Sequence, residues 1–267
     1  MKYFYVKITV IALAVIALFT VCFRLTHDKS DNLINGETAY NLSSWLAKND
    51  VSIDKDLIDI NSYEVVSVKF KNTLENHEAA AGMILGGNVS DKGADTYTGT
   101  RGTVTFSNDV FTLSPEEEAF KAEASKADRY NIGKRAEGMA KQMGFDLDGS
   151  MIMTSEEDNC YIVKIMKTVN SLPVFNNCIT ITVEDKSFTS ASGVWYVTDG
   201  ASYGKRAAKS AADALAGLLK AVDGMGRISV TSMTLGYKME KNDEGIYEIK
   251  PFWRFELANR EDVYIPA

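Results

Sequence analysis

Three short stretches contain residue types that bind phosphate or calcium or transfer protons, but none has a complete pattern. Gly200–Lys205 resembles a phosphate-binding loop, yet one residue is missing between its glycines and Arg206 stands where Ser or Thr would bind the metal ion. Asp146–Gly149 lacks the other oxygen ligands of a calcium loop. His77 lies in a polar stretch typical of a protein surface. We therefore expect no catalytic, cofactor-binding or metal-binding residue and no enzyme; a carboxylate pair that meets only in the fold is the alternative left open.

The chain has three cysteines, and two of them, Cys160 and Cys178, lie in stretches expected to be strands. A disulfide between them is compatible with an exported domain, because neighbouring strands can bring two thiols together. The alternative is two thiols buried as small apolar side chains. A zinc site is not expected, since only His27 and His77 could join them as ligands.

The N-terminal stretch Ile8–Phe23 is apolar and uncharged. With Tyr3-Phe4-Tyr5 it reaches the roughly 20 residues needed to cross a bilayer. A cleaved signal peptide would end in small residues, where this chain has Cys22-Phe23-Arg24, and a lipoprotein would need a small residue in place of Val21. We therefore expect a retained transmembrane signal anchor over residues 8–25.

Charge at the N-terminus predicts the orientation of this anchor. Lys2, Lys7 and the terminal amine place residues 1–7 in the cytoplasm, so the rest of the chain is expected on the extracytoplasmic side of the cell membrane.

One broad face of the anchor helix carries Thr9, Ala12, Ala17 and Thr20. Small and hydroxylated residues favour close helix–helix contacts in lipid, so these four are candidate partner-binding residues. The alternative is that this face meets only lipid.

Composition is that of an ordinary globular domain behind the anchor. The chain has 267 residues, 45% hydrophobic and 24% charged, with a net charge of −7. This acidic balance argues against a nucleic-acid partner. We expect a linker over residues 26–35, an N-terminal α+β subdomain over 36–127 and a C-terminal two-unit α+β subdomain over 128–267.

The C-terminal half shows a helix followed by a meander of strands twice, from Asn131 and again from Ser202. The string Gly-Lys-Arg-Ala is expected to open both helices, at Gly133–Ala136 and Gly204–Ala207. This order of elements predicts an α+β fold in which each unit lays one helix on an antiparallel sheet.

Several of these stretches also resemble a known family. Leu172–Asn177, followed by the strand Ile179–Val183 and by Ser192–Trp195, resembles the YycI family, as do the closing segments Pro251–Arg254 and Tyr264–Ala267. The likeness covers most of the chain beyond the anchor, and its motifs are structural, with no catalytic signature.

The resemblance implies a single-pass regulator in a Gram-positive bacterium. Proteins of this family, together with the similar YycH proteins, associate with the membrane sensor histidine kinase WalK (also called YycG), which controls cell-wall metabolism, and their transmembrane helices contribute to that contact. It also implies a fold similar to PepSY modules. Two alternatives stay open: a PepSY-like inhibitor or chaperone of an exported peptidase, in which the span is only a tether, and an envelope enzyme.

Overall fold

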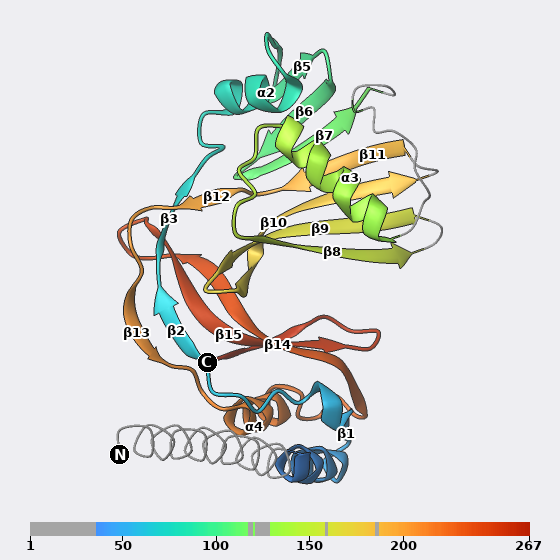
Figure 1. Cartoon of the computed structure of the whole chain (residues 1–267), viewed down its shortest axis with the longest axis vertical. Helices are drawn as coiled ribbons and strands as arrows, with labels where there is room; N and C mark the ends of the chain where they lie inside the picture. The colour runs from blue at the N-terminus through green and yellow to red at the C-terminus, as the bar shows by residue number, and fades with distance from the viewer. Residues whose placement is uncertain (1–35, 117–119, 121–128, 158–159, 185–186) are drawn as a thin grey trace, which may run out of the picture. The chain divides into compact units, whose positions relative to one another are not determined.

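The computed structural model describes residues 36–116, 120, 129–157, 160–184 and 187–267. The expected cytoplasmic segment, anchor and linker, residues 1–35, lie outside this range. The described chain is a mixed α+β fold in which strands predominate (Figure 1). Contacts divide the described residues into two compact units, each assembled from separate stretches. The first holds 36–62, Lys209–Thr234 and Arg254–Ile265, and the second holds the remainder.

These units differ from the continuous subdomains 36–127 and 128–267 that the sequence predicts. The reason lies in pairings between distant parts of the chain. Strand β1 (Val51–Ile53) pairs with β14 (Ile228–Lys241), and β3 (Lys69–Asn72) pairs with β15 (Tyr247–Leu257). Hydrophobic periodicity reports which face of a segment is buried, but it does not report which distant strand lies beside it.

The first unit contains a helical segment at residues 36–47, the short 3₁₀ turn η1 (Lys55–Leu57), β1, α4 (Ala211–Ala221) and β16 (Val263–Pro266), which pairs with β15. Ser210 caps α4, since its Oγ accepts from the Asp213 backbone N–H at 3.2 Å. Leu215 and Leu218 on this helix are fully buried, as the apolar spacing predicts.

The second unit holds most of the sheet. The strands wholly within it are the following: β2 (Glu64–Ser67), β3, β4 (Ser90–Gly93), β5 (Thr96–Gly99), β6 (Gly102–Ser107), β7 (Val110–Pro115), β8 (Ser150–Glu157), β9 (Cys160–Val169), β10 (Leu172–Glu184), β11 (Ser187–Gly193), β12 (Tyr196–Thr198) and β13 (Tyr203–Ala207). The main strand order is β12-β3-β15-β14-β10-β11-β7-β6-β5-β4, with β9 and then β8 extending from β10. Among the described strands, β13 and β2 form a separate two-stranded sheet.

Two helices cover one face of this sheet. Helix α2 (His77–Leu85) packs on β5 and β6, and α3 (Arg129–Gln142) lies across β8 and β9 (Figure 1). Apolar residues recur at helical spacing along α3 and just past its end, which predicts one buried face. All of them are buried: Ile132, Ala136, Met139, Ala140 and Met143. They join the inward residues of the strands in one core.

Two sequence expectations about these elements were wrong. The second Gly-Lys-Arg-Ala string does not open a helix: Gly204–Ala207 lies in β13, and α4 begins only at Ala211. The sheet is also not purely antiparallel, because β14 pairs in parallel with β1 and with β10, where Val174 lies opposite Tyr237. Ladder partners that are far apart in sequence decide both features.

Three tyrosines in the second unit are expected to make the stability of the fold depend on pH in the alkaline range. Burial raises the pKa of Tyr196 and of Tyr237 above 10.0, and the hydrogen bond that Tyr247 donates to Asp109 raises the pKa of Tyr247. A group whose pKa is raised on folding stabilises the fold below its unfolded pKa and ceases to do so as pH rises. We therefore expect the free energy of unfolding to fall progressively above pH 10.0. Denaturant midpoints measured between about pH 8 and about pH 11 test this, and Tyr196→Phe should flatten the curve; a midpoint unchanged across that range would contradict it.

Candidate functional site

The four candidate residues of the anchor face, Thr9, Ala12, Ala17 and Thr20, lie outside the described residues, so the expected contact with a partner helix stays a prediction. Among the helices that the structure does describe, none combines the length and apolar character needed to span a bilayer.

Cys160 and Cys178 are not bonded to each other. They lie on the adjacent strands β9 and β10, but the register places Cys160 opposite Glu184 and Cys178 opposite Met166. Six residues along a strand correspond to roughly 20 Å, well beyond the reach of a disulfide.

The stretches that hinted at chemistry have local structural roles. In the Gly200–Lys205 stretch, Lys205 forms an exposed ion pair with Glu64 across β13 and β2. Asp146 accepts a hydrogen bond from the Asp148 backbone N–H within its own turn. His77 contacts Asp95 at 3.0 Å. No group of three potential metal ligands occurs within the described ranges.

The paired asparagines of the Leu172–Asn177 motif join different strands to β10. Asn176 donates to the Met239 carbonyl and accepts from its N–H, at 2.8 and 2.7 Å. Asn177 makes the same pair of bonds to the backbone of Tyr196, at 2.9 and 3.0 Å, and is fully buried. The motif that carries the sequence resemblance is therefore structural.

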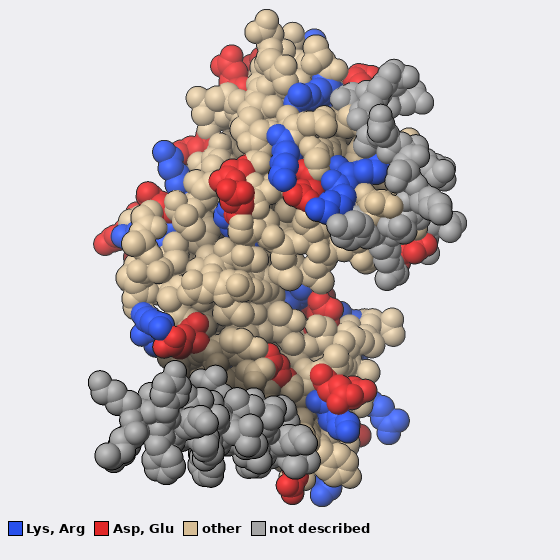
Figure 2. Space-filling model, in the orientation of Figure 1, with Lys and Arg blue, Asp and Glu red and all other residues tan. Residues whose placement is uncertain are grey.

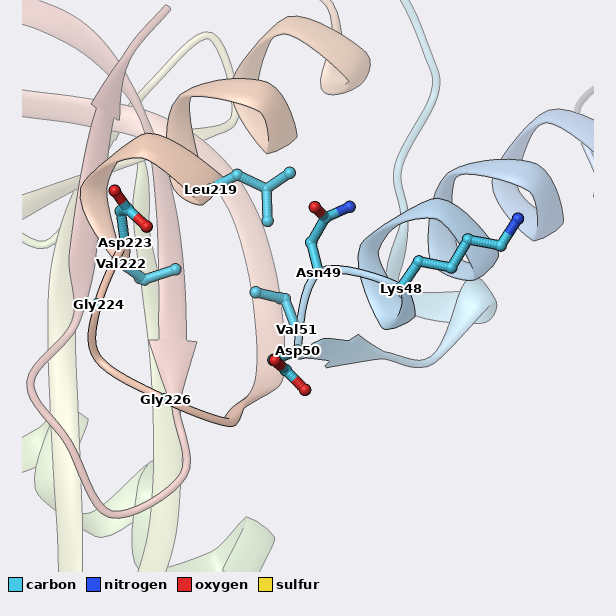
Figure 3. Close-up of a pocket in the computed structure, with 9 residues that line it drawn as sticks. All are labelled: Lys48, Asn49, Asp50, Val51, Leu219, Val222, Asp223, Gly224 and Gly226. Atoms are coloured by element: carbon cyan, nitrogen blue, oxygen red, sulfur yellow. The ribbon is translucent and has the colours of Figure 1, made fainter.

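A pocket of about 580 Å³ opens in the first unit where the helical segment 36–47 and α4 both end (Figure 3). Val51, Leu219 and Val222 supply apolar wall. Asp50 and Asp223 lie on opposite sides of it in Figure 3, and the amine of Lys48 points away from both. The pocket thus lacks the converging polar groups that fix a small ligand.

Strand β8 offers a different kind of site, because it pairs only with β9 among the described strands. Its Met151, Ile152 and Met153 are 36%, 37% and 44% exposed. Ile152 faces α3, since its Cγ2 lies 3.5 Å from the Cβ position of Gly133, and alternation places Met151 and Met153 on the opposite face. We call these three residues, with the outward backbone of residues 150–155, the β8 edge.

Edge strands usually carry a charge, a proline or a bulge that prevents further pairing. The β8 edge has none of these: residues 150–155 are uncharged and free of proline, and the β8–β9 register is continuous. Charge begins only at Glu156 and Glu157. The arrangement suits addition of an extended partner segment, with flexible methionines adapting to its side chains. Elsewhere on the surface, acidic and basic residues are interspersed, as Figure 2 shows for one face.

The apolar stretch Met151–Thr154, bounded by a charged turn, predicts a strand, but nothing in it indicates that this strand lies at a sheet edge. The sequence did contain one signal for this site. Met151, Ile152 and Met153 are three consecutive large apolar residues, a pattern typical of strands covered on both faces, whereas here all three are exposed.

The fold has counterparts among solved structures. One is the crystal structure of YycH from Bacillus subtilis, which aligns over 78% of this chain with a TM-score of 0.51. The fold is similar to that of YycH. The sequences are only 11% identical, and the chain spans about half of YycH, covering 53% of it.

Besides YycH, an uncharacterized protein from Eubacterium rectale aligns with a TM-score of 0.49 at 12% identity, over 77% of this chain and 82% of that one. The Bacillus megaterium YpeB C-terminal domain aligns with a TM-score of 0.34 at 10% identity, over 74% of this chain and 94% of that one. No protein-family model and no curated protein matches the sequence.

Proposed function

We propose that this protein is a single-pass membrane regulator that binds a sensor histidine kinase of the WalK (YycG) type and adjusts its output without catalysing a reaction. Residues 8–25 cross the membrane, residues 1–7 are cytoplasmic, and residues 36–267 face the extracytoplasmic side. The apolar span, the YycI-like motifs and the YycH-like fold support this proposal.

The observation that carries the proposal is the β8 edge. A sheet edge without protection, flanked by exposed Met151, Ile152 and Met153, is a surface for a protein partner. The exposed, acidic Glu157 at its end favours a partner segment with a basic residue there.

Regulation follows from differential binding. The anchor face Thr9, Ala12, Ala17 and Thr20 packs against one arrangement of the kinase transmembrane helices better than another, while the β8 edge holds the extracytoplasmic domains together. A ligand shifts an equilibrium only by the difference in its affinity for the two states, so both contacts act by shifting the population of kinase states.

The span exchange tests this function. Replacing residues 8–25 by an unrelated transmembrane helix of equal length keeps the tether but removes the anchor face. We expect kinase-dependent transcription to lose its response to this protein. An unchanged response would refute the role of the span, and capture of an exported peptidase by the exchanged chain would favour the PepSY-like inhibitor.

The β8 edge can be tested with Met153→Glu. The new carboxylate lies opposite Lys164 on β9, so the fold tolerates it, but a buried charge in the partner interface should weaken kinase binding roughly tenfold or more. Met225→Glu is the matched control, since Met225 is 46% exposed and lies outside the strands. Co-purification of kinase and full-length chain from membranes measures both. Equal losses in the two variants, or none in either, would rule out the β8 edge as the contact.

A further inference from the structure

The sheet face opposite α2 and α3 carries hydroxylated side chains at two alternating positions on each of five neighbouring strands. We call these ten residues the hydroxyl array: Thr180 and Thr182 on β10, Ser190 and Ser192 on β11, Thr112 and Ser114 on β7, Thr103 and Thr105 on β6, and Thr96 and Thr98 on β5. None of the ten is buried.

Strand register aligns these residues in rows. The first row runs through directly paired positions, Thr180–Ser192–Thr112–Thr105–Thr96. In the second row Thr182 pairs with Ser190, and Ser114 pairs with Thr103, which pairs with Thr98. Neighbouring strands lie about 4.8 Å apart and alternate residues about 7 Å apart, so the array is a grid roughly 19 Å long and 7 Å wide.

Packing in the core accounts for the residue types on the inward face of these strands, but it does not account for the hydroxylated residues on the outward face. The residues between the hydroxyls, such as Tyr97, Val104, Leu113, Ala191 and Ile181, point inward and are buried. Strand propensity accounts for threonine, which is enriched in strands, but serine shares no such preference. Within the array none of the ten positions is charged; charged residues border it at Lys164 beside Thr180, at Glu184 beyond Thr182 and at Glu116 beyond Ser114.

The chemistry of the array selects its ligand. Each hydroxyl has one donor and two acceptor lone pairs and carries no charge. Thr96 and Thr98 can already donate to the carbonyls of Ala94 and Ser90, and Thr96 contacts the Thr105 hydroxyl at 3.3 Å, so these positions present mainly acceptor lone pairs. A polyanion would leave its charges unmatched here, because phosphate and sulfate are bound by Arg, Lys and oriented N–H groups. A polymer that repeats neutral hydroxyl and amide groups matches the grid at many points. Each net hydrogen bond contributes only about 0.5–1.5 kcal/mol, so such binding depends on repetition along the ligand.

We propose that the hydroxyl array binds an uncharged glycan chain lying across the strands. The array shares no residue with the β8 edge, although Met153 of that edge lies on the same sheet face: Lys164 on β9 stands between Met153 and Thr180. Substitutions within the array and at Met153 therefore test the two proposals separately.

Retention on insoluble glycans tests the proposal. The full-length chain is purified in a detergent without a sugar head group, which would otherwise compete, and applied to chitin, cellulose and immobilised heparin. We expect retention on at least one neutral glycan and none on heparin. Thr105→Val with Thr112→Val removes two adjacent hydroxyls while keeping β-branched side chains, and should weaken retention roughly tenfold.

Thr198→Val with Thr231→Val is the matched control, because both threonines are exposed on strands outside the array. It should bind like the unchanged chain, and thermal melts verify that both double variants are folded. Equal retention of the unchanged chain and the array variant would overturn the proposal, as would retention on heparin alone or on none of the three supports.

Discussion

Gly236→Ala is expected to lower the free energy of unfolding by about 1–3 kcal/mol. A Cβ at this buried position on β14 would lie 2.6 Å from the Pro173 carbonyl oxygen and 2.5 Å from Cζ of Phe175. The Pro173 oxygen belongs to the backbone of β10 and cannot rotate away, so the parallel contact between β10 and β14 must open.

Gly138→Ala provides the matched control, because a Cβ there meets no atom within 4 Å and the residue lies inside α3. Alanine in a helix interior should stabilise the chain by about 0.5–1 kcal/mol. Denaturant unfolding measures both variants. Equal midpoints for the two would show that β10 and β14 do not approach as closely as described.

Asn177→Ala is expected to lower the free energy of unfolding by roughly 2–4 kcal/mol, because it leaves the buried N–H and carbonyl of Tyr196 without their hydrogen-bond partners. Asn176→Ala removes the same two kinds of bond, to Met239, from an exposed side chain that water can replace. We expect Asn176→Ala to lower the free energy of unfolding by at most about 1 kcal/mol. Thermal or denaturant unfolding of the two single variants gives the comparison, and a larger loss for Asn176→Ala would contradict the assigned roles.

The features that local periodicity controls could be predicted from the sequence. The spacing of Ile132, Ala136 and Met143 predicts the buried face of α3, and the turns around β9, β10 and β11 predict the meander. The aromatic residues Trp195, Phe252 and Trp253 lie in stretches that favour core or sheet-face positions. Trp195 and Trp253 are buried, and Phe252 is half-buried.

Features that depend on distant pairings could not be predicted. Nothing near β1 specifies that it pairs in parallel with β14, and nothing near Met151 specifies that β9 is the one described strand that pairs with β8. The role of Asn177 likewise depends on Tyr196, 19 residues away. The Thr-x-Thr spacing at Thr96, Thr103 and Thr180 was visible, but its alignment into rows required the register.

The most direct test of the regulatory function is photocrosslinking in intact cells. A photoreactive residue is placed at Ala12 in the anchor face or at Met153 on the β8 edge, with Met225 as the control position. We expect both test positions to capture a sensor histidine kinase and the control position to capture none. Capture of only lipid at Ala12, with an exported peptidase or no protein at Met153, would contradict it.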